Sequence, residues 1–175
     1  MRSYSACRKI TEWAESGARC AGVPRTSTTG TSGSGFPDPV LHGPAQERAE
    51  GSWLSHADAA SSVMMQVPGA GPFIGALLPV RLTGGYTVTY GVWVGVRPED
   101  LQRAFRVWWE PDYLDLRLNG LLANVIQPWG LLAAPVHLAV RDPEQTPYCV
   151  SSPNAVFAGV LDDEWPHETV LATLP

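Results

Sequence analysis

The stretch LLPVRLTGGYTVTYGVWVGVRPEDLQRAFRVWW, residues 77–109, decides the fold. From Tyr86 to Val96, Tyr and Val alternate with a second set made of Thr, Gly and Trp93, and a period of two is typical of a strand with one buried face. The residues from Ala76 to Leu82 alternate in the same way. Two glycines separate the runs, and glycine adopts left-handed turn conformations at little cost. The stretch therefore predicts a β-hairpin, with its first strand over 73–83.

The loop of this hairpin should hold an odd number of residues. A two-residue loop would put the apolar side chains of one strand beside the polar side chains of the other, because a slip by one residue turns every side chain over. A three-residue loop, Thr83-Gly84-Gly85, pairs Leu82 with Tyr86 and sets apolar residues opposite one another. We therefore predict a loop of three or five residues.

A helix is predicted after the hairpin, beginning at Pro98 and ending before Pro111. Proline suits a first helical turn, and Glu99 and Asp100 place negative charge at the positive end of the helix dipole. Apolar residues then recur at intervals of three and four, as in one buried stripe. The stripe consists of Leu101, Ala104, Phe105, Trp108 and Trp109. We expect it to pack on the sheet, so that Phe105→Ala costs about 3 to 5 kcal/mol.

Length and composition favour one domain, over 36–175, that is large enough to bury a core. The segment 1–35 ends in the low-complexity run TSTTGTSGSG and is expected to be disordered or loosely attached. A net charge of -5 argues against a nucleic-acid partner, which requires clustered Lys and Arg. A membrane partner is not predicted either, because there is neither a signal peptide nor an apolar run of about 18 residues. We expect a cytoplasmic protein.

The three cysteines do not indicate a disulfide framework or a metal site. Cys7, Cys20 and Cys149 are odd in number and widely spaced, whereas structural zinc is usually held by four ligands in closely spaced pairs. No metal and no cofactor is therefore predicted. Cys149 is expected to be a small buried hydrophobic residue within a strand.

Shorter patterns complete the expected fold. Strands are predicted at 62–67, 132–140 and 147–151, and two short helical pieces at 154–161 and 166–174. Strands and helices do not alternate as they do in doubly wound parallel folds. The sequence thus predicts an α+β fold: a mainly antiparallel sheet of four to six strands, with one principal helix packed on a face.

Local catalytic motifs are absent from the sequence: there is no phosphate-binding loop, dinucleotide fingerprint, zinc-protease helix or nucleophile elbow. Two histidines are nevertheless candidates for acid–base chemistry. His56 lies two residues before Asp58, so the pair could be a base and the carboxylate that orients it. The same segment is also typical of a solvated turn with a helix cap, because Ser55 and Asp58 are good capping residues. His137 lies on the less apolar face of a strand, where a half-exposed or hydrogen-bonded histidine is expected. A hydrolase-like enzyme using His56 or His137 with a nearby carboxylate stays open as an alternative.

Residues 90–111, YGVWVGVRPEDLQRAFRVWWEP, resemble family 2199 of the bacterial domains of unknown function. The similarity extends through GLLANVIQPWG at 120–130 and APVHLAV at 134–140, and covers about 36–165. Family members often begin with a cysteine-bearing, zinc-ribbon-like piece, which the first 30 residues of this chain do not match. The resemblance implies a fold and a bacterial setting, but no established activity.

Aromatic content without a catalytic signature favours a non-enzymatic domain that binds a protein partner or a small ligand. The candidate binding residues are Trp93, Trp108, Trp109, Asn124, Trp129 and His137. Core packing is the more ordinary role for Trp108 and Trp109. Exposure of two candidate rings in one patch would support the binding hypothesis, because contiguous exposed apolar surface marks interaction sites.

Overall fold

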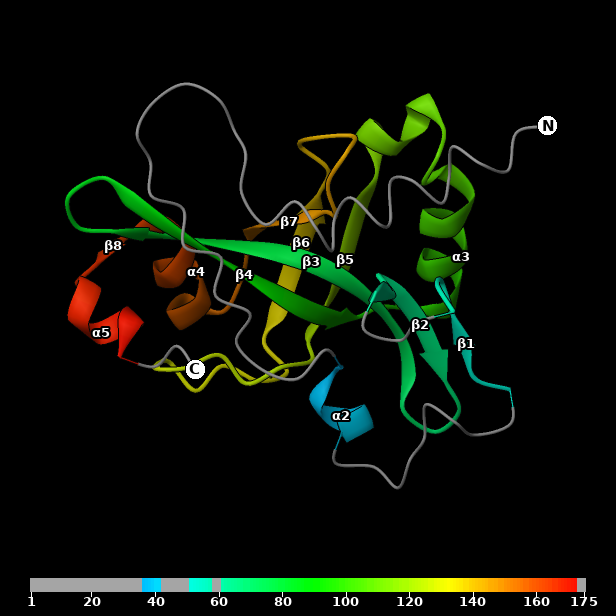
Figure 1. The fold of residues 1–175 in the computed structure, drawn as a ribbon, viewed down its shortest axis with the longest axis horizontal. Coiled ribbons are helices and arrows are strands. Elements are labelled where there is room, and N and C mark those ends of the chain that lie inside the picture. Colours follow the sequence, from blue (N-terminus) through cyan, green and yellow to red (C-terminus); the bar gives the residue numbers. More distant parts are fainter. Residues whose placement is uncertain (1–35, 42–50, 58–60, 173–175) are drawn as a thin grey trace.

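The computed structural model describes residues 36–41, 51–57 and 61–172. Eight strands form one sheet in the order β1-β2-β3-β4-β5-β6-β7, and β8 pairs with β3 (Figure 1). The strands are β1 (Trp53–Leu54), β2 (Met64–Val67), β3 (Gly71–Leu82), β4 (Tyr86–Gly95), β5 (Arg117–Leu122), β6 (Pro135–Ala139), β7 (Tyr148–Ser151) and β8 (Glu164–Trp165). The helices are α2 (Asp38–Leu41), α3 (Pro98–Val107), α4 (Ala155–Asp162) and α5 (His167–Leu171), and a 3-10 helix, η3, spans Pro111–Asp115.

Five of the strands close into a barrel. β3 to β7 follow one another as antiparallel neighbours. β7 then pairs with β3 in parallel, with Leu77 opposite Tyr148, and the Leu77 N–H donates to the Pro147 carbonyl at 2.8 Å. The prediction of a mainly antiparallel open sheet with one principal helix is therefore wrong: the barrel is mixed, and four short helices surround it. Periodicity marks each strand but carries no information on which strands meet at the closure.

The hairpin of β3 and β4 has the predicted register. Leu82 pairs with Tyr86, and Thr83, Gly84 and Gly85 form the loop. Gly84 and Gly85 have φ angles of 82° and 81°, which is the left-handed region that glycine enters without a Cβ clash. The three-residue loop is confirmed. The end of the hairpin extends beyond the barrel, where β8 pairs with β3 and α5 lies beside it (Figure 1).

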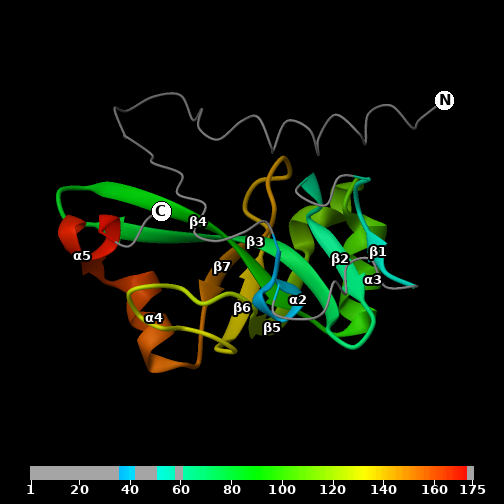
Figure 2. The same cartoon turned by 60° about the horizontal axis from the view of Figure 1, so that its bottom comes forward.

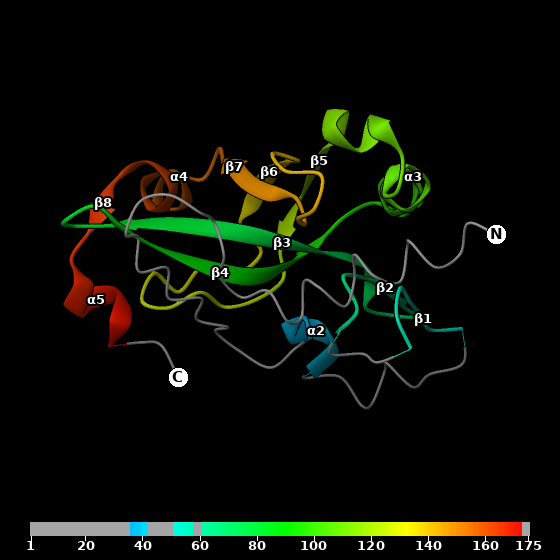
Figure 3. The ribbon, with the colours of Figure 1, turned by 45° about the horizontal axis from the view of Figure 1, so that its top comes forward.

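Buried side chains fill the barrel and form a second cluster on its outside. Within the barrel Leu78 lies opposite Tyr90, and both side chains are almost fully buried. At one end of the sheet, α3 lies beside β1 and β2 (Figure 2), and at the other, α4 packs on β3 and β7 (Figure 3). The second cluster packs α2 against the face of the sheet that points away from the barrel interior. It consists of Val40, Met65, Val67, Phe73, Trp93 and Ala123.

Helix α3 begins at Pro98 as predicted, and Arg97 Nε donates to Asp100 Oδ2 at 3.0 Å across its first turn. The buried stripe is narrower than expected. Leu101, Ala104 and Trp108 are buried, whereas the Phe105 side chain is 50% exposed. At 100° per residue, position 105 falls on the margin of the stripe rather than at its centre. The predicted burial of Phe105 against the sheet, and the large cost of Phe105→Ala derived from it, are therefore wrong.

The C-terminal elements agree with the sequence patterns. β7 pairs antiparallel with β6; α5 lies within its predicted helical piece, and α4 ends one residue beyond the predicted 154–161. Asn154 caps α4, with its Oδ1 accepting from the Phe157 N–H at 3.0 Å. The predicted N-terminal segment, including Cys7 and Cys20, lies outside the described residues. Among the helices of the described residues, none has the length and apolar character to cross a membrane.

Candidate functional site

Two of the predicted binding residues, Trp93 and Asn124, make contacts within the fold that join distant segments of the chain. Asn124 is buried, and its Oδ1 accepts from the Trp93 main-chain N–H at 2.6 Å. Its Nδ2 donates to the Phe36 carbonyl at 3.1 Å and to Asp38 Oδ1 at 3.2 Å. Asp38 Oδ2 also accepts from the Val125 N–H at 2.7 Å. The amide of Asn124 thus fastens the start of α2 to the end of β5, and the Trp93 ring is buried in the second cluster.

Trp108 and Trp109 are neighbours in sequence but differ in burial. Trp108 is buried and its ring lies 4.7 Å from that of Tyr113, whereas Trp109 is half-buried. The two tryptophan rings meet edge to face with centroids 6.3 Å apart. Core packing is therefore confirmed for Trp108, and Trp109 reaches the surface.

Trp129 pairs with Trp165 from β8, edge to face, with ring centroids 5.0 Å apart. Trp165 Nε1 donates to the Gly159 carbonyl at 3.4 Å, whereas Trp129 Nε1 is buried without a partner among the described residues. Both rings are half-buried against the main core. The pair therefore joins the 126–131 turn to the C-terminal elements. Exposure of two of the candidate tryptophan rings in one patch was to support the binding hypothesis, and the structure exposes no two of them together.

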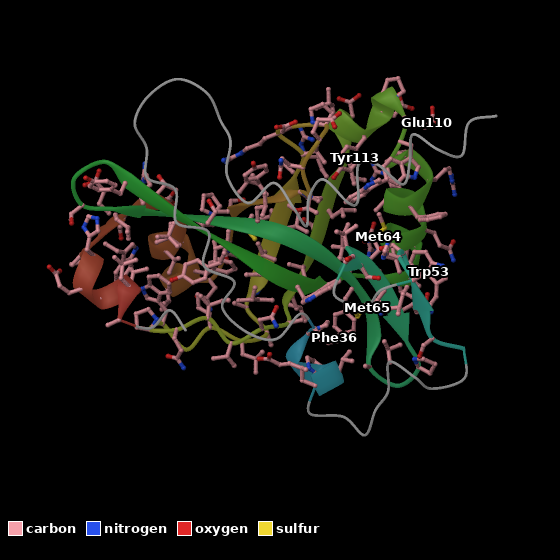
Figure 4. All side chains as sticks on the ribbon, in the orientation of Figure 1. Phe36, Trp53, Met64, Met65, Glu110 and Tyr113 are labelled. Atoms are coloured by element: carbon pink, nitrogen blue, oxygen red, sulfur yellow. The ribbon has the colours of Figure 1, made fainter. Side chains whose placement is uncertain are left out.

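The most exposed aromatic contact was not predicted from the sequence. Trp53 on β1 and Phe105 on α3 meet edge to face with ring centroids 5.2 Å apart, and they are 37% and 50% exposed. Figure 4 shows Trp53 at the margin between β1 and α3. The residues are 52 positions apart, and only the pairing of β1 with β2 brings them together. Trp109 follows the end of α3, and its ring contacts that of Trp108.

His56 lies in the connection between β1 and β2. The Ser62 hydroxyl accepts from the His56 N–H at 3.2 Å, and the Ser55 hydroxyl accepts from the N–H groups of Val63 and Met64 at 3.0 Å. These contacts join the end of β1 to the start of β2, across eight and nine residues, whereas a helix cap accepts from an N–H two or three residues on. Asp58, the proposed partner of His56, lies outside the described residues.

His137 is exposed on β6, and its Nδ1 lies within hydrogen-bonding distance of Asn119 Oδ1 on β5. The partner is an amide rather than the carboxylate that the hydrolase hypothesis requires. An amide oxygen can only accept, so in this contact the Nδ1 of His137 is the donor. A half-exposed or hydrogen-bonded histidine was predicted here, and the contact with Asn119 agrees with the hydrogen-bonded alternative. Asn119 was not recognised, because nothing in the sequence pairs residues 119 and 137.

The pKa values of two buried side chains, Cys149 and Tyr113, are raised, and both side chains have structural roles. Burial raises the pKa of the Cys149 thiol to about 12, so the residue behaves as the small hydrophobic side chain that was predicted. Burial, and then the charge of Asp142, raise the pKa of Tyr113, whose hydroxyl donates to the Gln145 carbonyl at 2.8 Å. Within the described part of the chain, no group of three or more His, Cys, Asp or Glu side chains could hold a metal ion.

Sequence and structure comparisons do not assign a family to the chain. No family model, no curated protein and no solved structure matches it. The residues described above are therefore the basis for a functional proposal.

Proposed function

We propose that this protein is a domain that binds a protein partner through the ring pair of Trp53 and Phe105. One observation carries the proposal: two large aromatic side chains from different elements, 37% and 50% exposed, are held edge to face at the surface. Aromatic rings are enriched among the residues that dominate binding energy at interfaces, because they bury much area with few rotatable bonds.

The surroundings of the ring pair extend this surface. Trp109, two residues after the end of α3, is half-buried and packs against the main core. Arg106, next to Phe105, is exposed and makes no ion pair with any described residue. An interface that combines aromatic anchors with arginine is typical of protein recognition. We expect the partner to offer an apolar side chain to the rings and an acidic side chain to Arg106.

Membership of family 2199 and a cytoplasmic, bacterial setting belong to the same proposal. The motif at 90–111 supports the family and the bacterial setting. Cell fractionation with an antibody against the chain tests the location.

Site-specific photo-crosslinking tests the binding surface. A benzophenone side chain replaces Phe105 in one variant and Val156, on α4, in the control; Val156 is 54% exposed and lies on a different element. After irradiation in the source organism, we expect a discrete crosslinked protein from position 105 and none from position 156. Adding Trp53→Ser to the variant with benzophenone at position 105 should reduce the amount of crosslinked protein. The same products from both positions, or none from 105, would refute the proposal.

A further inference from the structure

Strand β1 is the last strand at one side of the sheet. Among the described strands it pairs with β2 alone, with Leu54 opposite Met65. In an antiparallel pair, the main-chain groups of successive residues alternately face the neighbouring strand and face away from it. Just after β1, the Ser55 N–H donates to the Met64 carbonyl at 2.9 Å. Leu54, one position earlier, therefore turns its N–H and C=O away from β2.

The main-chain groups of Leu54 are available for pairing. Neither the N–H nor the C=O makes a hydrogen bond with another described residue, and the residue is only partly buried. Residues 51–55, GSWLS, contain neither a charged side chain nor a proline, which are two of the means by which proteins keep an edge strand from pairing with another chain. The edge of β1 can therefore accept one more strand, hydrogen-bonded at Leu54.

The two side chains of β1 lie on opposite faces of the sheet. The Leu54 side chain packs against the second cluster, on the side of α2, whereas the Trp53 ring meets that of Phe105 on α3. Directly opposite residues on neighbouring strands have Cβ atoms about 4.5–5.5 Å apart, so a side chain opposite Trp53 on an added strand would contact its ring. The free edge and the exposed ring pair can thus bind one extended segment together.

Helix α3 adds a positive charge beside the same rings. Arg106 directly follows Phe105, is exposed and makes no ion pair with any described residue. Arg97, by contrast, pairs with Glu99 and Asp100 at the start of the helix. Arginine binds carboxylates in a planar, two-pronged geometry, so an unpaired arginine beside aromatic anchors favours an acidic side chain on the partner. The charge of this surface therefore fits an acidic segment rather than a basic one.

We propose that the partner binds as an extended segment that adds a strand to the free edge of β1. This inference rests on the proposed function and specifies the form that the partner takes at that surface. The segment carries an apolar side chain opposite Trp53, which packs on the ring pair, and a carboxylate for Arg106. Leu54 offers one donor and one acceptor, so two main-chain hydrogen bonds set the register while the rings provide most of the affinity.

Two variants at position 54 test the strand pairing in the full chain, with benzophenone at position 105 as the crosslinker. Leu54→Pro removes both the outward N–H and the leucine side chain, whereas Leu54→Ala removes the side chain alone. Proline is tolerated on an edge strand where the N–H faces solvent, and melting temperatures compare the stability of the two variants. We expect Leu54→Pro to give about 10-fold less crosslinked protein than Leu54→Ala, because a main-chain hydrogen bond is lost and the proline ring obstructs its place.

A second measurement leaves the protein unaltered. The partner peptide that crosslinks to position 105 is identified by mass spectrometry and synthesised with one N-methyl group at each residue in turn, and binding is followed by fluorescence anisotropy. An added strand should lose affinity about 10-fold at the residue whose N–H donates to the Leu54 carbonyl. The residues on either side of it should tolerate the methyl group, because their N–H groups face away from β1. This series decides the question if Leu54→Pro does not fold.

The outcomes separate this inference from the proposed function. No crosslinked protein from position 105 would overturn both. Equal crosslinking in the two variants, or a peptide that tolerates the N-methyl group at every residue, would overturn the added strand and leave the partner-binding surface in place. A peptide weakened at several consecutive residues, as expected for a helix laid on the rings, would do the same. A product with the mass of two copies of this chain would show self-association and overturn the acidic partner segment.

Discussion

Replacing Asn124 by leucine should destabilise the protein strongly, because the side chain is buried and fully hydrogen-bonded to three partners. The substitution removes the acceptor of the Trp93 N–H and the donor to Phe36 and Asp38. Leaving a buried N–H without its acceptor costs about 1 to 3 kcal/mol, and each of the two longer bonds contributes about 0.5 to 1.5 kcal/mol. The expected loss in the free energy of unfolding is therefore about 2 to 6 kcal/mol.

Two further variants test the hydrogen-bond pattern itself. Asn124→Asp keeps the acceptor for the Trp93 N–H but places a second carboxylate against that of Asp38, so it should also destabilise. Adding Asp38→Asn to this variant restores a donor between the two side chains and should recover part of the loss. Urea unfolding followed by tryptophan fluorescence gives the free energies if the m-value is unchanged. An Asn124→Leu loss below about 0.5 kcal/mol, or no recovery in the double variant, would refute the reasoning.

Phe105→Ala should cost only about 1 kcal/mol because the ring is half exposed, whereas Trp108→Ala should cost about 3 to 5 kcal/mol, and thermal melts of the two variants compare them. In a Cys7→Ser, Cys20→Ser background, a thiol reagent at neutral pH should label Cys149 no faster than the chain unfolds; immediate labelling would contradict its burial. The unfolded thiol ionises near 9.0 and the folded thiol near 12, so this residue should make stability fall as pH rises from about 9 to 12, as urea titrations can measure. Removing 1–35 should leave the melting temperature within a few degrees, since the described core begins at Phe36.

The parts of the fold that follow from local pattern were predictable from the sequence. The hairpin register follows from two alternating runs and a double glycine, and α3 follows from a proline, two acidic residues and a period of three to four. In each case the deciding interactions join residues that are close in the chain. The structural roles predicted for Trp108 and Cys149, as buried side chains, and for His137, as a hydrogen-bonded one, agree with the structure. Burial and exposure follow from the same periodicity as the strands and the helix.

The remaining features depend on contacts between distant residues. Trp53 meets Phe105 only because β1 pairs with β2 and α3 lies beside both. Asn119 reaches His137 only through the pairing of β5 with β6, and the bulge at Val150 leaves no mark in the sequence pattern. Phe105 was misplaced for another reason: an apolar residue on the margin of a helical stripe satisfies the period whether or not it is covered. Residues at the edge of an apolar stripe, such as Phe105, can therefore form part of the exposed surface.

The closure between β3 and β7 has a consequence for how the chain folds. An antiparallel meander of five strands returns with its last strand running in the same direction as its first, so this barrel can close only through a parallel pair. The joined residues, 77 and 148, are far apart in sequence, and the entropy of closing so large a loop must be met before the pair forms. The β3–β4 hairpin, with its three-residue loop, carries no such penalty and should form early, with the parallel seam completed late. Because β3 pairs with β2, β4, β7 and β8, its amide protons should be among the slowest to exchange with solvent.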